Sequence, residues 1–145
     1  MTSVSHRLLQ AFFWMVCVFH VVVGVGLNVS AGFPRLMAEY YGATVDWTPQ
    51  FNYILKPLGA FMFVLGLLAA AAAREPMRYR VVAYLFATLF TIRALQRLVF
   101  GGDIHDAFSI SFARNMGNAV LFLALAATLL GLHFWAQRDS AAEVR

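Results

Sequence analysis

Three basic residues lie inside long apolar stretches of the sequence, where a charged side chain is rare. Arg93 and Arg97 are four residues apart, so a helix would place both on one face. Lys56 occurs in a separate apolar stretch and is followed by Pro57, whose ring removes a backbone donor and kinks a helix. A cation at the centre of a bilayer costs about 2.5–3.5 kcal/mol, so an anionic group should lie near these residues.

Two further polar residues are expected near these cations. At a rise of about 1.5 Å per residue, Lys56, Arg93 and Asn118 fall at similar depths in three different helices, and Gln96 lies between the arginines. Three helices would therefore contribute polar groups to one layer in the outer half of a bundle. The candidate ligand-binding residues are Lys56, Arg93, Arg97, Gln96 and Asn118.

The sequence leaves two interpretations of this layer open. In the first, acids of the connecting segments cover the cations, and the long side chains reach outward, which makes a structural polar plug. The acids expected on that side are Glu39, Asp46, Asp103 and Asp106. In the second, the cations line a pocket for a lipid phosphate, a carboxylate, a small oxyanion or a quinone head group.

Other chemistries have less support in the sequence. His20 and His133 differ in expected depth by about 10 Å or more, which argues against a haem held by both. The segment Asp103–Asp106 (DIHD) has no further ligand cluster, so it is interpreted as an acidic turn at a helix end and no metal is predicted. Neither a nucleophile with a base nor a phosphate-binding loop is found, so catalysis is not expected. A bound quinone or lipid is the remaining cofactor candidate.

Composition and hydropathy predict the elements that hold these residues. The 145 residues are 61% hydrophobic and 12% charged, whereas soluble domains are about 45–50% apolar and about 25% charged. This excludes an ordinary soluble domain and a disordered chain. Four apolar stretches are long enough to span a bilayer. They cover about residues 8–30, 49–73, 76–100 and 112–136. We therefore predict one all-α domain over residues 1–145, an integral membrane four-helix bundle.

The connections carry their own signals. Thr48-Pro49 and Glu75-Pro76 have the pattern of helix starts, and Gly101-Gly102 should end the third span. One longer outer loop joins the first two spans, and its residues 34–41 could form a short amphipathic helix at the interface.

Basic residues near the span ends predict the orientation, because such residues are retained in the cytoplasm. They favour cytoplasmic termini, and they are Arg7, Arg74, Arg78, Arg80, Arg138 and Arg145. The net charge of +4 is explained by these residues without a nucleic-acid partner. The expected partners are membrane lipids and other membrane protein subunits.

Two segments, KPLGAFMFVLGLLAAAAAREPMRYR and RALQRLVF, resemble the DoxX-like and BphX-like group of small four-helix bacterial membrane proteins. The resemblance covers about half of the chain. It rests on Lys56-Pro57-Leu58-Gly59, Gly66, the turn around Arg74-Glu75-Pro76, and the Arg93 and Arg97 pair.

This resemblance implies the bacterial inner membrane and a role beside membrane redox systems. We therefore predict a non-catalytic accessory subunit or assembly factor of a larger redox or energy-converting complex. The alternative is a quinone- or anion-binding oxidoreductase component that uses the cationic pocket in the outer half of the bundle.

Overall fold

A computed structural model describes residues 3–143, and Arg145, one of the basic residues used above for orientation, lies outside this range. Within it the chain forms only helices. They are α1 (Val4–Val29), α2 (Phe33–Tyr41), α3 (Pro49–Arg74), α4 (Arg80–Val99), α5 (Gly101–Phe108) and α6 (Phe112–Glu143). Four of them, α1, α3, α4 and α6, are long and apolar enough to cross a membrane. The predicted all-α class and the four predicted spans are confirmed to this extent.

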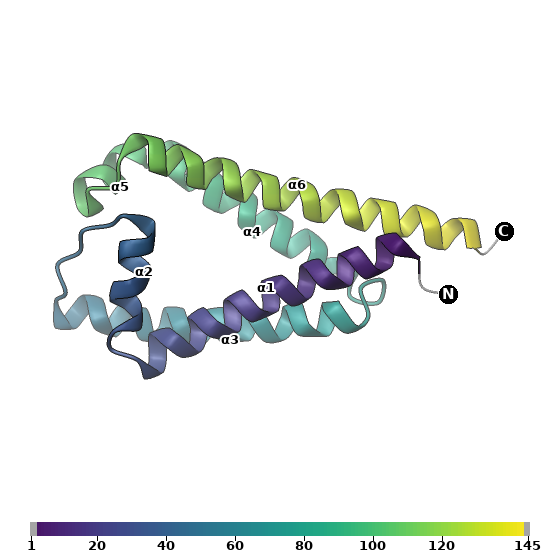
Figure 1. The fold of residues 1–145 in the computed structure, drawn as a ribbon, viewed down its shortest axis with the longest axis horizontal. Helices are drawn as coiled ribbons and strands as arrows, with labels where there is room; N and C mark the ends of the chain where they lie inside the picture. Colours follow the sequence, from purple (N-terminus) through teal and green to yellow (C-terminus); the bar gives the residue numbers. More distant parts are fainter. Residues whose placement is uncertain (1–2, 144–145) are drawn as a thin grey trace.

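The four long helices form two pairs that diverge from one another (Figure 1). Helices α1 and α3 lie side by side, as do α4 and α6. The pairs come together near the two chain termini and separate toward the end that carries α2 and α5, which we call the open end. Helix α2 lies across this open end, between the pairs. Val4, where α1 begins, and Glu143, where α6 ends, lie at the opposite end.

Glycines let α1 and α3 approach within backbone contact. A methyl group at Gly24 of α1 would lie 2.6 Å from the backbone nitrogen of Phe63 and 2.8 Å from the carbonyl oxygen of Gly59. About two turns further along α3 from Gly59, a methyl group at Gly66 would lie 2.6 Å from Val21 Cγ2 of α1. Small residues at a helix contact are a common device of membrane proteins, because they bring two backbones close together.

The most completely buried side chains lie where the two pairs meet, toward the termini. Phe13 of α1 and Phe86 of α4 pack edge to face there, with ring centroids 6.5 Å apart. Leu9 and Leu129 are also fully buried in this region, and small alanines of α3 fill the remaining space. This core holds the pairs together at one end and leaves the open end less densely filled.

Two helix boundaries differ from the prediction. Helix α4 begins at Arg80 and not near residue 76, because residues 76–79 form a turn in which the Tyr79 amide donates to the Glu75 carbonyl at 3.1 Å. Helix α6 continues to Glu143, beyond the predicted end near residue 136. Its last part carries polar residues, and a hydropathy pattern marks the membrane boundary of a helix more clearly than its true end.

The short helices at the open end are a partial surprise. Helix α2 confirms the predicted helix at residues 34–41, and Gly42 ends it with a φ of 68° in the left-handed region. The predicted end of the third span before Gly101-Gly102 is confirmed, because α4 ends at Val99, but an unpredicted helix, α5, starts at Gly101 and runs to Phe108. The Ile104 amide donates to the Phe100 carbonyl at 2.9 Å, so helical bonding resumes after the bend. Asp103 then lies in the first turn of α5, where a carboxylate complements the helix dipole.

Candidate ligand-binding cavity

An apolar cavity of about 450 Å³ lies between the two helix pairs in the half of the bundle where they diverge. All six helices contribute to its wall, together with the segment that joins α2 to α3. Most lining side chains are Phe, Leu, Met or Val, and the ionisable members other than Tyr41 are His20, Arg93 and Arg97. A volume of this size is within the range of about 300–1,000 Å³ that is typical of small-molecule sites.

Helix α2 closes the cavity at the open end by contacting both helix pairs. At its first residue, the ring of Phe33 packs so closely on α1 that a methyl group at Gly26 would lie 2.6 Å from it. At its last turn, the Arg114 guanidinium of α6 donates to the Tyr40 carbonyl. The Thr44 amide then donates to the Phe108 carbonyl at 2.8 Å, which attaches the following segment to α5.

Lys56 is bound by the end of a neighbouring helix. Its ammonium donates to the carbonyl oxygens of Leu27 and Asn28, at 2.9 and 3.0 Å, in the last turn of α1. The carbonyls at a helix carboxyl end carry the negative end of the helix dipole and favour a cation. Lys56 is therefore compensated by backbone carbonyls, and it is not among the residues that line the cavity.

Arg97 is compensated by an asparagine of α6. Its Nη1 donates to Asn115 Oδ1 at 2.9 Å, and Asn115 Nδ2 donates back to the Arg97 carbonyl at 2.8 Å. Asn115 is only 2% exposed. The guanidinium carbon also lies 5.8 Å from the centre of the Tyr41 ring, within cation–π range. Sequence reasoning missed Asn115, whose signal was its place just after the α4–α6 connection, level with Arg97.

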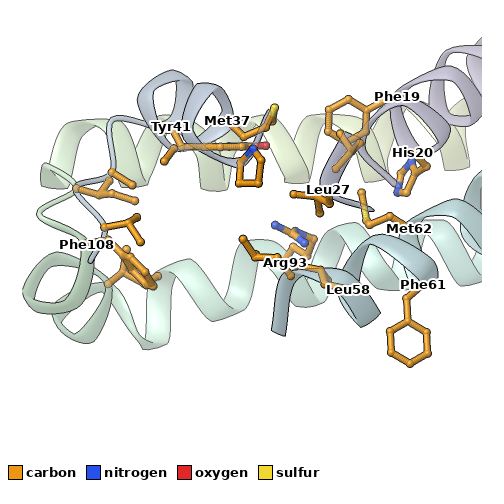
Figure 2. A pocket seen from close by; sticks show the side chains of 18 of the residues that line it. Phe19, His20, Leu27, Met37, Tyr41, Leu58, Phe61, Met62, Arg93 and Phe108 are labelled. Atoms are coloured by element: carbon orange, nitrogen blue, oxygen red, sulfur yellow. The ribbon is translucent and has the colours of Figure 1, made fainter. Parts of the chain in front are cut away.

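Arg93 lines the cavity without a hydrogen-bond acceptor. Its guanidinium carbon lies 5.0 Å from the centre of the Phe122 ring of α6, and this cation–π contact is its closest compensation. Within residues 3–143 it has neither an acceptor oxygen nor an ion pair. Figure 2 shows Arg93 in the middle of the cavity, between the end marked by Tyr41 and Phe108 and the end marked by His20 and Met62.

The acids considered as partners for the three cations do not pair with them in the described part of the chain. The ion pair found there joins Arg78 to Glu75 at 3.1 Å, in the exposed turn between α3 and α4. That carboxylate raises the pKa of the Arg78 guanidinium through a hydrogen bond. The acids without such a pair are Glu39, Asp46, Asp103 and Asp106. The polar-plug interpretation therefore lacks its proposed counter-charges.

The five predicted ligand-binding residues do not all meet at one place. Arg93 and Arg97 line the same cavity. Lys56, Gln96 and Asn118 are not part of its wall. Gln96 is exposed on α4, and the Nδ2 atom of Asn118 is buried with no acceptor among residues 3–143. The predicted layer is therefore not a single site. Lys56 binds the end of α1, Arg97 joins α4 to α6, and Arg93 and Arg97 line the cavity.

A second polar residue of the cavity wall, His20, lies at the end away from Tyr41 and Phe108. The residue is 4% exposed, and its ring packs edge to face against Phe86 at 5.4 Å between centroids. It lines the cavity in which Arg93 lies. His133 lies elsewhere, with its ring centroid 5.1 Å from that of Tyr84 of α4, and it does not line this cavity. From the sequence, His20 was considered only as a haem ligand paired with His133.

The chemistry available at the cavity is that of binding. Within residues 3–143 no group of three or more His, Cys, Asp and Glu side chains is arranged to hold a metal ion. The cavity presents a guanidinium, a buried imidazole and a large apolar wall that together suit an apolar molecule with a polar oxygen. No protein-family model, curated protein or solved structure matches the chain.

Proposed function

We propose that this protein binds an apolar small molecule that carries an anionic oxygen, and that Arg93 binds that oxygen inside the membrane. The observation that supports this most directly is the Arg93 guanidinium, which faces a large apolar cavity with no acceptor of its own. A guanidinium in an apolar site is unfavourable when it is left unpaired. A carboxylate or phosphate oxygen would supply short, charge-assisted hydrogen bonds to it.

The charge of the wall favours an anion over a neutral quinone. Arg93 and Arg97 both line the cavity, and no Asp or Glu of the part of the chain that the structure describes does so. A neutral carbonyl would accept a hydrogen bond from Arg93 but would leave its charge uncompensated in a medium of low dielectric constant. We therefore propose an anionic ligand, and the experiment below also tests a neutral quinone as the alternative ligand.

Binding of a fluorescent fatty acid tests this proposal. The probe is dansylated undecanoic acid, added to the protein in lipid nanodiscs, with free nanodiscs as the blank. Arg93→Gln is expected to weaken binding by about 10- to 100-fold, because a hydrogen bond to a charged group contributes about 1.5–3 kcal/mol. Arg80→Gln is the matched control, since Arg80 is an exposed arginine of the same helix outside the cavity.

Equal affinity in the wild-type protein and in Arg93→Gln would contradict the proposal. Competitors then identify the head group. Dodecanoate should displace the probe, and a short-chain quinone such as decylubiquinone should not. If only the quinone displaced the probe, the ligand would be a molecule with a neutral carbonyl and not an anion.

We also propose that the chain lies in a bacterial inner membrane with both termini in the cytoplasm, as the distribution of arginines favours. Single cysteines in a Cys17→Ser background test the orientation. A membrane-impermeant maleimide should label Thr44→Cys in intact cells and should label Ser140→Cys only after the membrane is opened. The reverse labelling pattern would invert the orientation.

A second proposal, a non-catalytic accessory role in a larger membrane complex, is favoured by the outer face of α6. Gly117, Ala124 and Gly131 are exposed and seven residues apart. A methyl group added at either of these glycines would meet no atom within 4 Å. Such a small-residue face allows a helix of another subunit to approach closely. Binding of a ligand and membership of a complex are compatible roles.

A further inference from the structure

The hydrogen bonding of His20 fixes which ring atom faces outward from α1. Nδ1 lies 2.8 Å from the carbonyl oxygen of Val16, one turn earlier in the same helix. A carbonyl oxygen only accepts, so Nδ1 carries the proton and donates it. In the neutral ring, Nε2 is then left with a lone pair and acts as an acceptor.

The Nε2 atom has no partner among residues 3–143, although the residue is 4% exposed and packed between aromatic rings. The ring lines the cavity, so the space that this acceptor can use is the space in which a ligand would lie. A second proton on the ring would place another cation in the same apolar cavity as Arg93, which has no hydrogen-bond acceptor of its own among the described residues. The neutral ring, with Nε2 as an acceptor, therefore suits this environment. Nε2 then needs a hydrogen-bond donor.

We infer that the ligand carries a hydroxyl group in addition to its anionic oxygen, and that Nε2 of His20 accepts a hydrogen bond from this hydroxyl. The inference rests on the proposed function, because it assigns the second polar contact of the same cavity. Arg93 would bind the oxygen that only accepts, and His20 would recognise the oxygen that donates. A plain fatty acid would satisfy Arg93 and leave Nε2 unpaired. The ligand class is thus an apolar hydroxy acid.

Positional isomers of hydroxydodecanoic acid test this assignment against dodecanoic acid, by displacement of the dansylated probe from nanodiscs. One isomer, or two neighbouring ones, should bind the wild-type protein about fivefold to tenfold more tightly than dodecanoate, as a single hydrogen bond allows. In His20→Phe, which keeps a ring but removes the acceptor, this gain should disappear while dodecanoate binds as before. His20→Gln, whose amide oxygen accepts, should restore part of it.

The outcomes separate the two claims. If no isomer binds more tightly than dodecanoate, or if the gain persists in His20→Phe, the hydroxyl contact is wrong and the role of Arg93 stands. If dodecanoate itself binds independently of Arg93, the proposed function fails. Loss of dodecanoate binding in His20→Phe would show that His20 only supports the cavity wall. The same conclusion would follow if His20→Gln still bound dodecanoate but bound no hydroxydodecanoate isomer more tightly.

Discussion

Gly24→Ala is expected to separate α1 from α3 and to lower the free energy of unfolding by about 2–3 kcal/mol, the upper part of the usual range for overpacking. The reason is the position of the added carbon, 2.6 Å from a backbone nitrogen of Phe63 and 2.8 Å from a backbone oxygen of Gly59. Backbone atoms cannot rotate away as a flexible side chain does, so the helices must move. The measurement is unfolding in mixed detergent micelles at increasing denaturing detergent.

Gly117→Ala is the matched control for this prediction. Gly117 also lies in a long helix, but a methyl group there would meet nothing within 4 Å. Alanine favours a helix over glycine, so this variant should be as stable as the wild-type protein or slightly more stable. Equal stability of Gly24→Ala and Gly117→Ala would mean that α1 and α3 do not pack through their glycines.

Asn115→Leu is expected to destabilise the protein by about 2–3 kcal/mol, since it removes the acceptor of a charged donor. Asn115 is nearly fully buried and exchanges two hydrogen bonds with Arg97, one with its side chain and one with its backbone. Leucine would leave the guanidinium without its acceptor and the carbonyl without its donor. The same detergent unfolding experiment measures the loss.

Two companion variants make this result specific. Asn118→Leu alters the same residue type one turn away, but its Nδ2 atom has no acceptor, so its removal should not destabilise the protein. In the double variant Arg97→Met with Asn115→Leu, part of the lost stability should return, because the uncompensated cation is gone. A double variant that is less stable than either single variant would show that the two side chains do not act as a pair.

Hydropathy and spacing were sufficient to predict the long helices. Each span is recognisable from its own residues, because a helix that crosses a bilayer needs an apolar surface along its whole length. The short helix α2 was suggested by residues 34–41, but this segment is too short for its periodicity to be decisive. Helix α5 was not predictable, since Gly101 and Gly102 resemble a helix stop, and only the hydrogen bonds around Phe100 show that helical bonding resumes.

The partners of the three cations could not be predicted from the sequence. Their places inside long helices follow from their positions in apolar segments, but a partner depends on which helices become neighbours. Lys56 binds carbonyls of α1 because α3 packs against α1 through glycines, and Arg97 binds Asn115 because α4 packs against α6. The backbone carbonyls that compensate Lys56 have no signature in a sequence, because every residue has one.

The cavity itself also depends on the arrangement of the helices. The two pairs are joined tightly near the termini and held apart by α2 at the open end, and an apolar space with Arg93 and His20 in its wall results. The resemblance to the DoxX-like and BphX-like group stays a prediction, as does the accessory role that it implies. The function argued above depends instead on the position of Arg93.

Native mass spectrometry of the protein, extracted with its surrounding lipid, shows whether the cavity holds an apolar acid through Arg93. We predict that the wild-type protein retains an apolar acid, that Arg93→Gln has lost it, and that Arg80→Gln retains it. A stoichiometric larger complex in the same spectrum would support the accessory role as well. The claim would be contradicted if the wild-type protein retained no such molecule, or if Arg93→Gln carried the same molecule in the same amount.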